Sequence, residues 1–256
     1  MQNIQYKTSE IKEYYSSNRH TWNEFYPSER HIISDVMNKA KKNSTILDVG
    51  CAAGGLGCAL GEHFGISNYT GIDINKPVIE YAKRQTKIPD CNFEFIHGDI
   101  ADKTIQIKDS RFDVVISLGC IDWNVNLNNS INACWEKVER GGYFALSLRL
   151  TQEEGVNDID KSYQSIHFSD TAKKGNQEKA NYVVLNVFDA LKLLTSLNPE
   201  CIDVYGYWGK PSDTAVTPYN CILFTVCSIK KSKTSEVADP VVRLNLPVSA
   251  LSNLNS

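Results

Sequence analysis

The stretch TILDVGCAAGGLG, residues 45–57, decides the fold. Its first five residues are mostly apolar and include β-branched side chains, which is typical of a buried strand. A run of small residues follows and leads into apolar residues at helical spacing. Small residues at the end of a strand let the backbone approach a ligand closely, and the amide groups that open a helix suit a polar ligand. We therefore expect a strand, a ligand-binding turn and a helix in this order.

The alternation of strand and helix continues downstream. Further strands are predicted at 69–73, 93–97, 112–118 and 143–150. Between them, apolar residues recur at the i, i+3, i+4 and i+7 positions of helices. This alternation is the signature of a parallel sheet with helices on both faces.

Two last strands are predicted at 201–208 and 221–229. Their connection contains Pro211 and Pro218 and shows no helical pattern. A parallel return needs a longer crossover, usually a helix, so these strands should pair antiparallel. The predicted fold class is therefore α/β: a doubly wound, mostly parallel seven-stranded sheet with an antiparallel last strand and helices on both faces.

The domain organisation follows from the same patterns. Residues 1–43 are predicted to form an N-terminal helical cap or lid, and residues 44–229 the core. A polar, glycine-punctuated insert at about 151–182 is too long for a routine connection, and such inserts often serve the substrate side. The tail at 230–256 is rich in Ser and Asn, and we expect it to be flexible or docked.

Composition excludes several classes of protein. Lys and Arg total 27 against 30 Asp and Glu, and no basic block occurs, which argues against a nucleic-acid partner. The eight cysteines form no CxxC pair, so we expect a reducing compartment and no metal. The N-terminus lacks the apolar region of a signal peptide, and no apolar run could cross a membrane. We expect a cytoplasmic protein without a membrane partner, and a homodimer stays open.

Three acidic residues are predicted at strand ends on one edge of the sheet: Asp48, Asp73 and Asp99. Ligands of doubly wound sheets bind at this edge. Three carboxylates would repel a phosphate but suit a ligand with a positive centre, a ribose and an adenine amine. Asp73 is placed to accept the ribose hydroxyls, and Asp99 the amine. S-adenosylmethionine has all three features.

Five segments together carry a family resemblance. They are ILDVGCAAGGLG (46–57), YTGIDIN (69–75), FIHGDI (95–100), FDVVISLG (112–119) and GGYFALSLR (141–149). In this order they resemble the motif series of class I S-adenosylmethionine-dependent methyltransferases. The resemblance covers residues 44–150, and the final antiparallel pair also suits that fold. Five ordered segments are far more specific than one glycine-rich turn.

The resemblance implies roles for individual residues. The turn would pass the methionine part of the cofactor, with Asp48 near its amino group, Asp73 on the ribose and Asp99 on the adenine. The implied cofactor-binding residues of this region are Asp48, Gly50, Cys51, Ala52, Gly54, Asp73, Ile74, Asp99, Ile100, Ser117 and Leu118. One departure is Ala52, which stands where the family usually has its middle glycine. We expect a slightly shifted turn that still binds the cofactor.

The acceptor side should begin after the fourth strand, with Asp122 and Trp123. Asp122 would orient or deprotonate a hydroxyl or amine, or alternatively cap the next segment, and Trp123 would form a pocket wall. Arg149 should emerge at the same edge, to hold an acidic group of the substrate or to pair within the insert. His167 in the insert is a candidate general base, because its ordinary pKa lies near working pH, or else an incidental loop residue.

The N-terminal segment is rich in aromatic residues. In the family that the sequence resembles, such a segment often folds over the cofactor. Tyr14 and Arg19 are therefore candidate cofactor contacts, with Arg19 pairing the cofactor carboxylate, and Trp22 and Tyr26 are candidate substrate contacts. The alternative is that these side chains pack against the edge of the sheet.

The predicted function is methyl transfer from S-adenosylmethionine to a small-molecule acceptor in a biosynthetic pathway, at oxygen in preference to nitrogen and without a metal. The residues SLGC at 117–120 differ from the Asn/Asp-Pro-Pro-Tyr/Phe motif of enzymes that methylate amino groups of nucleic acids. A catalytically idle, cofactor-binding partner subunit and a protein methyltransferase stay as alternatives. A nicotinamide-binding Rossmann domain is disfavoured, because it would want glycine in place of Ala52.

Overall fold

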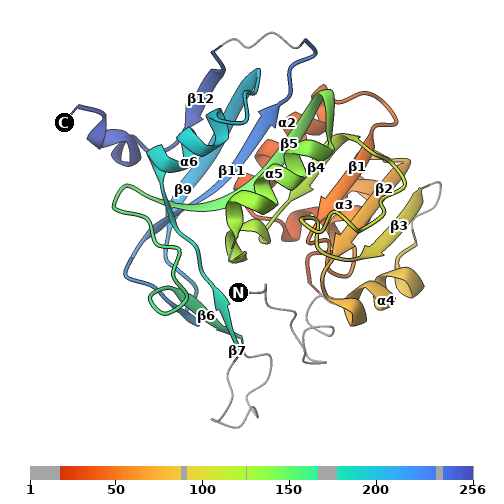
Figure 1. The fold of residues 1–256 in the computed structure, drawn as a ribbon, viewed down its shortest axis with the longest axis horizontal. Helices are drawn as coiled ribbons and strands as arrows, with labels where there is room; N and C mark the ends of the chain where they lie inside the picture. Colours follow the sequence, from red (N-terminus) through yellow and green to blue (C-terminus); the bar gives the residue numbers. More distant parts are fainter. Residues whose placement is uncertain (1–17, 88–90, 125, 167–177, 235–238, 256) are drawn as a thin grey trace.

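The structure is a computed structural model that describes residues 18–87, 91–124, 126–166, 178–234 and 239–255. Tyr14 and His167, two of the predicted site residues, lie outside these ranges. Within them the chain forms one large sheet with helices on both faces and a smaller sheet beside it (Figure 1).

The large sheet has nine strands in the order β12-β9-β11-β5-β4-β1-β2-β3, with β8 also paired to β5. Strand β11 runs antiparallel to both of its neighbours, and the other pairings are parallel. The strands are β1 (Thr45–Val49), β2 (Asn68–Asp73), β3 (Asn92–His97), β4 (Phe112–Ser117), β5 (Val138–Thr151), β8 (Leu185–Asn186), β9 (Cys201–Gly209), β11 (Ile222–Lys230) and β12 (Val241–Asn245).

The predicted α/β class is therefore confirmed, and all seven predicted strands are present. The predicted number of strands was too low, because β8 and β12 extend the sheet. A strand of two residues such as β8 is too short to show a period, and β12 lies in the tail that was not assigned to the sheet.

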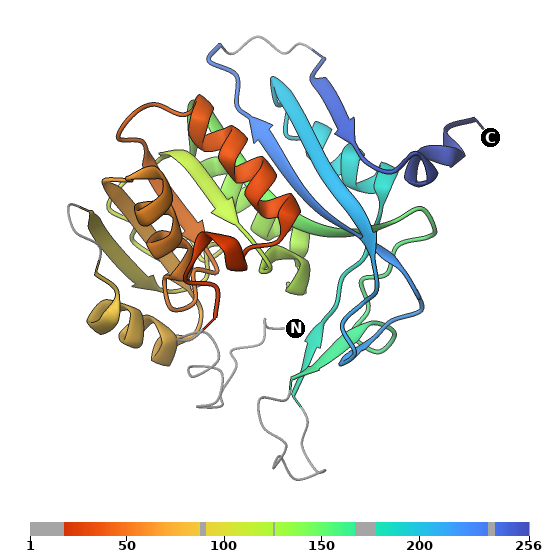
Figure 2. The same cartoon turned by 180° about the vertical axis from the view of Figure 1, so that it is seen from behind.

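Two helical layers enclose the sheet (Figures 1 and 2). One apolar cluster joins a face of the sheet to α2, α3 and α4, and a second joins the opposite face to α5 and α6. Alternate residues of a strand enter the two clusters, as with Ile46 and Leu47 of β1. The helices are α2 (Pro27–Lys39), α3 (Gly55–Phe64), α4 (Lys76–Gln85), α5 (Leu127–Lys137) and α6 (Val187–Thr195). None of the helices in the described ranges combines the length and apolarity that a membrane span requires.

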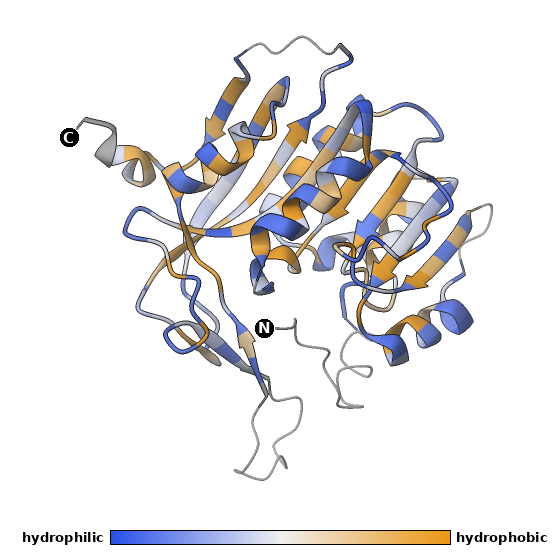
Figure 3. Ribbon diagram, in the orientation of Figure 1, coloured by the Kyte–Doolittle hydropathy of each residue, from blue (hydrophilic) through white to orange (hydrophobic). Residues whose placement is uncertain are grey.

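Hydropathy follows this layering (Figure 3). The strands of the large sheet are mostly hydrophobic, whereas the helices alternate between hydrophobic and hydrophilic residues.

Helix α2 belongs to the N-terminal region that was predicted to form a cap or lid. Its residues Ile32, Ile33 and Val36 are buried in the cluster that includes the sheet. Helix α2 is thus a core helix, and the predicted cap or lid can comprise only residues that precede it.

The smaller sheet combines two parts of the chain. Strand β6 (Tyr163–Ile166) pairs antiparallel with β7 (Glu178–Asn181) and with β10 (Ala215–Val216). Strands β6 and β7 belong to the predicted insert, and β10 lies in the connection between β9 and β11. The insert is therefore joined to the hairpin connection and lies beside the carboxyl ends of the central strands (Figure 1).

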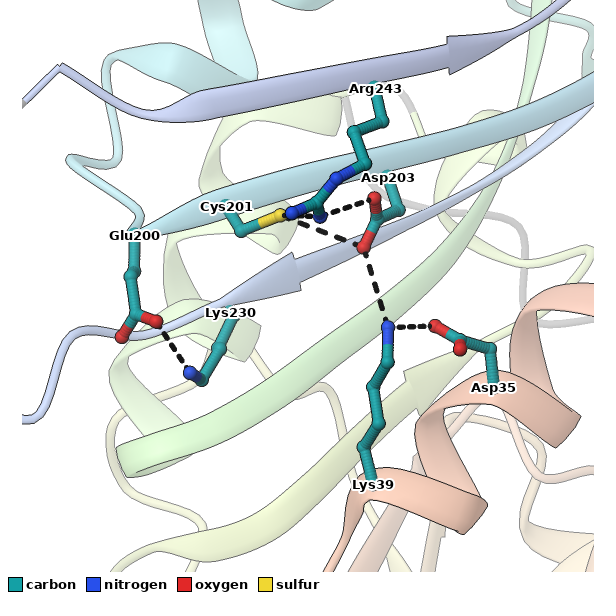
Figure 4. A network of polar contacts seen from close by, with 7 residues as sticks. All are labelled: Asp35, Lys39, Glu200, Cys201, Asp203, Lys230 and Arg243. Atoms are coloured by element: carbon teal, nitrogen blue, oxygen red, sulfur yellow. Dashed lines mark hydrogen bonds and ion pairs between the residues drawn. The ribbon is translucent and has the colours of Figure 1, made fainter.

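The C-terminal tail is docked on its own chain. Strand β12 pairs parallel with β9, and the 3-10 helix η3 (Val248–Asn255) follows it. The Nη1 atom of Arg243 on β12 lies 3.0 Å from Oδ1 of Asp203 on β9, whose Oδ2 lies 3.9 Å from Nζ of Lys39 on α2 (Figure 4). For the described residues, the tail thus adds a strand to the same sheet.

Candidate active site

The order of strands reverses at β1, which has β2 and β3 on one side and β4 and β5 on the other. Ligands of doubly wound sheets bind at such a reversal, beyond the carboxyl ends of the strands. A pocket of about 980 Å³ lies there, lined by the turn after β1, the ends of β2 and β4, the insert and the β9–β11 connection. This volume is near the upper end of the range of about 300–1,000 Å³ for small-molecule sites, so it suits two ligands side by side.

The turn after β1 requires glycine at two positions. Gly50 has φ +81°, and a Cβ atom added there would lie 2.4 Å from Sγ of Cys120. Gly54 has φ +82°, and a Cβ atom there would lie 2.7 Å from the ring of Phe95. Both the left-handed backbone and the lack of space exclude other residues without rearrangement. The backbone at Gly50 can therefore line the pocket directly.

Ala52 adopts a left-handed backbone conformation, which glycine adopts more readily. Its φ is 48°, in the left-handed region, which costs an alanine about 1–2 kcal/mol. Its N–H donates to Oδ2 of Asp73 over 3.0 Å, which offsets part of this cost. The turn thus has glycine-like geometry in spite of the substitution.

Asp73 ends β2 and is held by two backbone amides. Its Oδ1 accepts from the N–H of Asn75 over 2.8 Å, and its Oδ2 accepts from that of Ala52. Burial raises the pKa of the Asp73 carboxyl, and the two amide hydrogen bonds act in the opposite direction. Each carboxylate oxygen can accept more than one hydrogen bond, so the fixed side chain retains capacity for ligand hydroxyls.

Asp48 is the last residue but one of β1 and is almost fully buried, and the hydroxyl of Tyr69 on β2 donates a hydrogen bond to its Oδ2. Burial raises the pKa of Asp48 to about 7; the Tyr69 hydrogen bond and the charge of Arg19 lower it, and Asp73 raises it. A cationic group bound nearby would favour the ionised form. Sequence reasoning missed Tyr69, because it lies inside a strand.

The third acidic residue, Asp99, follows β3 and also lines the pocket. Its Oδ1 accepts from the N–H of Ala101 over 2.9 Å. Ser117 and Gly54 do not line the pocket; the Ser117 hydroxyl is buried and donates to the carbonyl of Val49 over 3.0 Å. The predicted cofactor residues that do line it are Arg19, Asp48, Gly50, Cys51, Ala52, Asp73, Ile74, Asp99, Ile100 and Leu118.

Arg19 lies at the edge of this pocket, ahead of α2. Its Nη2 pairs with Oε1 of the buried Glu29 over 2.8 Å, and its guanidinium lies 4.6 Å from the ring centroid of Phe25. The side chain is therefore fixed by packing and still lines the pocket. The predicted contact of Arg19 with the cofactor stays a prediction.

Trp22 lies away from the pocket. Its indole stacks on the His63 ring of α3 at a centroid distance of 4.9 Å and contacts the edge of Phe64. It is absent from the described residues that line the pocket, and this position gives no support to the predicted substrate contact. An aromatic residue near a site does not reveal from the sequence alone which way its side chain faces. Tyr26, in contrast, lines the pocket.

Asp122 and Arg149, predicted separately, are partners. Asp122 lies in the 3-10 helix η2 (Ile121–Trp123) and Arg149 near the end of β5. The Nε atom of Arg149 lies 3.0 Å from Oδ2 of Asp122, and each side chain is 5% exposed. Burial raises the pKa of Asp122, and the charge of Arg149 opposes the shift. The predicted cap by Asp122 and the predicted pairing of Arg149 within the insert are thus replaced by this ion pair.

Two aromatic rings cover the guanidinium of Arg149. Its Cζ lies 4.3 Å from the centroid of Trp123 and 3.7 Å from that of Tyr182, which comes from the insert. The two rings meet edge to face at 5.7 Å. Cation–π contacts with two rings fix the guanidinium, so the insert holds one wall of the site.

Sequence reasoning missed the far wall of the pocket. Tyr182 directly follows β7, Tyr207 and Phe224 lie on the neighbouring strands β9 and β11, and residues 210–214 lie in the connection of that hairpin. No motif marks these residues. The predicted antiparallel pairing of the hairpin is the only sequence signal that could have placed these residues beside the pocket.

In the described part of the chain, no three His, Cys, Asp or Glu side chains are arranged to hold a metal ion.

Comparison with known proteins identifies the family. Residues 40–184 match the methyltransferase domain family, so more than half of the chain belongs to it. The chain is therefore a member of the methyltransferase domain family, and the resemblance to class I S-adenosylmethionine-dependent methyltransferases is confirmed.

Individual relatives are distant. A putative methyltransferase 235L of invertebrate iridescent virus 6 is 25% identical over 143 residues, 56% of this chain and 51% of that protein. A fatty-acid O-methyltransferase of Mycolicibacterium smegmatis is 29% identical over 99 residues, 39% of this chain and 35% of that protein. The chain thus spans about half or less of these relatives.

Among solved structures, the glycopeptide N-methyltransferase MtfA, complexed with S-adenosylmethionine, has the same fold. It aligns with a TM-score of 0.52 and 15% identity, over 80% of this chain and 93% of that one. At this identity the likeness concerns the fold alone. The family match is what supports S-adenosylmethionine as the cofactor.

Proposed function

We propose that this protein is an S-adenosylmethionine-dependent methyltransferase that acts on a small-molecule acceptor. The observation that carries the proposal is one continuous pocket with two differently built ends. One end joins the glycine turn to Asp48, Asp73 and Asp99, and the other joins the Asp122–Arg149 pair to aromatic walls. A methyl donor and an acceptor must meet in such a shared space.

The first end fits the donor by charge and space. S-adenosylmethionine, when bound, supplies a methyl group on a positively charged sulfur. Asp73 would accept from the ribose hydroxyls, Asp99 from the adenine amine, and Asp48 would face the ammonium group. Arg19 is the pocket-lining cation on the N-terminal side and would pair with the carboxylate of the methionine part.

The second end would hold the acceptor. Trp123 and Tyr26 supply aromatic surface, and Asp122 would accept a hydrogen bond from the nucleophile. Burial raises the pKa of Asp122 and the charge of Arg149 opposes the shift, so this carboxylate would both orient the acceptor and accept its proton. Alignment and water exclusion can supply about 7–11 kcal/mol, so a strong base is not required.

Oxygen is the preferred target, as the sequence predicts, and a small molecule the preferred acceptor. The fatty-acid O-methyltransferase among the relatives supports oxygen as the target. The insert, which lines one side of the pocket, supports a small molecule as the acceptor. The absence of a CxxC pair among the eight cysteines and the slight excess of Asp and Glu over Lys and Arg favour a cytoplasmic biosynthetic role. Whether the protein forms a homodimer stays open.

Calorimetry followed by a transfer assay tests the proposal. S-adenosylhomocysteine should bind the purified protein, and S-adenosylmethionine with oxygen acceptors should yield S-adenosylhomocysteine. No binding of either compound would overturn the proposal. Binding without transfer to any acceptor panel would favour the idle partner subunit, and transfer only to proteins would favour a protein methyltransferase.

A further inference from the structure

The Asp122–Arg149 pair is incompletely satisfied. Oδ1 of Asp122 and Nη1 of Arg149 are both buried, and neither has a hydrogen-bonding partner among the described residues. Buried polar atoms of this kind are normally satisfied in native proteins, and charged ones are the most costly to leave alone. Because both residues line the pocket, a ligand is the natural source of the missing partners.

The free atoms differ in kind. Nη1 is a hydrogen-bond donor, whereas Oδ1 of the ionised carboxylate is an acceptor. Nη1 belongs to the same guanidinium as the paired Nε, and Oδ1 to the same carboxylate as the paired Oδ2, with 3.0 Å between the paired atoms. One small planar group that offers an acceptor and a donor would supply both missing partners.

The charge of the pair selects against an anion. Arg149 is already neutralised by Asp122, and Glu29, which also lines the pocket, acts on Asp122 as a further negative charge. A carboxylate ligand would gain one hydrogen bond from Nη1 and meet repulsion at Oδ1. A cation would meet the guanidinium. A neutral group with a carbonyl beside an N–H or O–H complements both atoms.

We propose that Asp122 and Arg149 together form a specificity subsite for a neutral acceptor that carries a carbonyl next to a hydroxyl or N–H group, such as a carboxamide or a hydroxycarbonyl ring. Nη1 of Arg149 donates to the carbonyl, and Oδ1 of Asp122 accepts from the O–H or N–H. Trp123 and Tyr182 keep the guanidinium in place and close the subsite with apolar surface. This assignment revises the sequence-based expectation that Arg149 holds an acidic group, and it rests on the proposed function.

A matched pair of probes tests the subsite. Salicylamide and salicylate share a ring and a hydroxyl and differ in a neutral amide against a carboxylate. Each is titrated into the full chain saturated with S-adenosylhomocysteine, with binding followed by calorimetry. Salicylamide should bind at least about tenfold more tightly, the effect of one well-made hydrogen bond. Tighter or equal binding of salicylate, or no binding of either probe at millimolar concentration, would overturn the proposal.

Variants tie the preference to the pair. Removal of a single partner would strand a buried charge and could unfold the protein, so the test variant is the double substitution Asp122→Leu/Arg149→Met, which keeps apolar volume. The matched control is Asp203→Leu/Arg243→Met, which removes the ion pair between β9 and β12. The preference for salicylamide should vanish in the first variant and persist in the second. Its persistence in both would contradict the assignment.

The two hypotheses fail differently. Binding of S-adenosylhomocysteine is measured before either probe is added. If it fails in the wild-type protein, the proposed function falls. If it succeeds and the probes show no preference for the amide, only the subsite falls.

Discussion

The hydroxyl of Tyr69 donates a hydrogen bond to the carboxylate of Asp48 inside the sheet, between the neighbouring strands β2 and β1. Both side chains are almost fully buried. The phenol therefore supports the charged form of an acidic residue whose pKa burial raises to about 7. In the proposed function this residue faces the ammonium group of the cofactor, so its ionisation should control cofactor affinity.

Tyr69→Phe should shift the pH dependence of cofactor binding. Affinity for S-adenosylhomocysteine should rise as pH increases through about 7, because Asp48 then loses its proton. Without the phenol, a hydrogen bond of about 1.5–3 kcal/mol to a charged group is lost, so the midpoint should move up by about one pH unit or more. Calorimetric titrations across this pH range measure the midpoint, and an unchanged midpoint would separate Asp48 from the cofactor.

The same carboxyl makes stability depend on pH. The pKa of Asp48 is about 7 in the folded protein against 3.8 ordinarily, so the folded state retains the proton between these values. The contribution of Asp48 to the free energy of unfolding is therefore complete below about pH 4 and is lost as pH rises toward 7. A bound ammonium group favours the ionised form, so S-adenosylhomocysteine should raise the Tm more at about pH 8 than at about pH 6. An equal or smaller rise at the higher pH would count against this contact.

Asp73→Ala should weaken S-adenosylhomocysteine binding severely, by about a hundredfold or more, because two charge-assisted hydrogen bonds to the ribose disappear. The substitution also frees the N–H of Ala52 and so loosens the turn. Asp102→Ala is the control: this exposed carboxylate lies beyond β3 and caps its own loop through Thr104. Wild-type affinity in the Asp73 variant, with the control also unchanged, would remove Asp73 from its proposed role.

The cofactor end of the site can be proposed from the sequence because each of its parts is local. The small residues at 50–55 and the acids at strand ends can be read without knowing what packs against them. The acceptor end could not be predicted in this way. Asp122 and Arg149 are far apart in the chain, and their pairing depends on η2 and β5 meeting in space. Tyr182, which covers the pair, carries no pattern at all.

Strand β12 was not predicted either, because its sequence lacks a local pattern. It lies at the edge of the sheet, and Val241 and Val242 are both largely exposed. An edge strand with exposed side chains shows no alternation between buried and exposed positions, so its sequence resembles a polar tail. The contact that places it, Arg243 with Asp203, spans two distant segments (Figure 4).

Ala52→Gly should stabilise the protein. Glycine adopts the φ of 48° found here without the penalty that a side chain carries, and the gain should exceed the extra entropy of the unfolded chain. We expect about 1 kcal/mol, seen as a rise in the midpoint of urea unfolding at constant m value. The opposite change, Gly50→Ala, should destabilise, because its Cβ would lie 2.4 Å from Sγ of Cys120. A loss of stability in Ala52→Gly would show that the turn is not strained.

Asp122→Asn should slow methyl transfer more than it weakens cofactor binding. The substitution leaves the size of the side chain unchanged but removes the charge that pairs with Arg149 and the acceptor capacity of one oxygen. The acceptor would then be held in the wrong orientation, and misplacement by about 1 Å can cost on the order of a hundredfold in rate. Single-turnover rates and S-adenosylhomocysteine affinity, measured on the same preparation, separate the two effects. Unchanged turnover in a folded variant would place Asp122 outside the reacting groups and leave it a purely structural partner of Arg149.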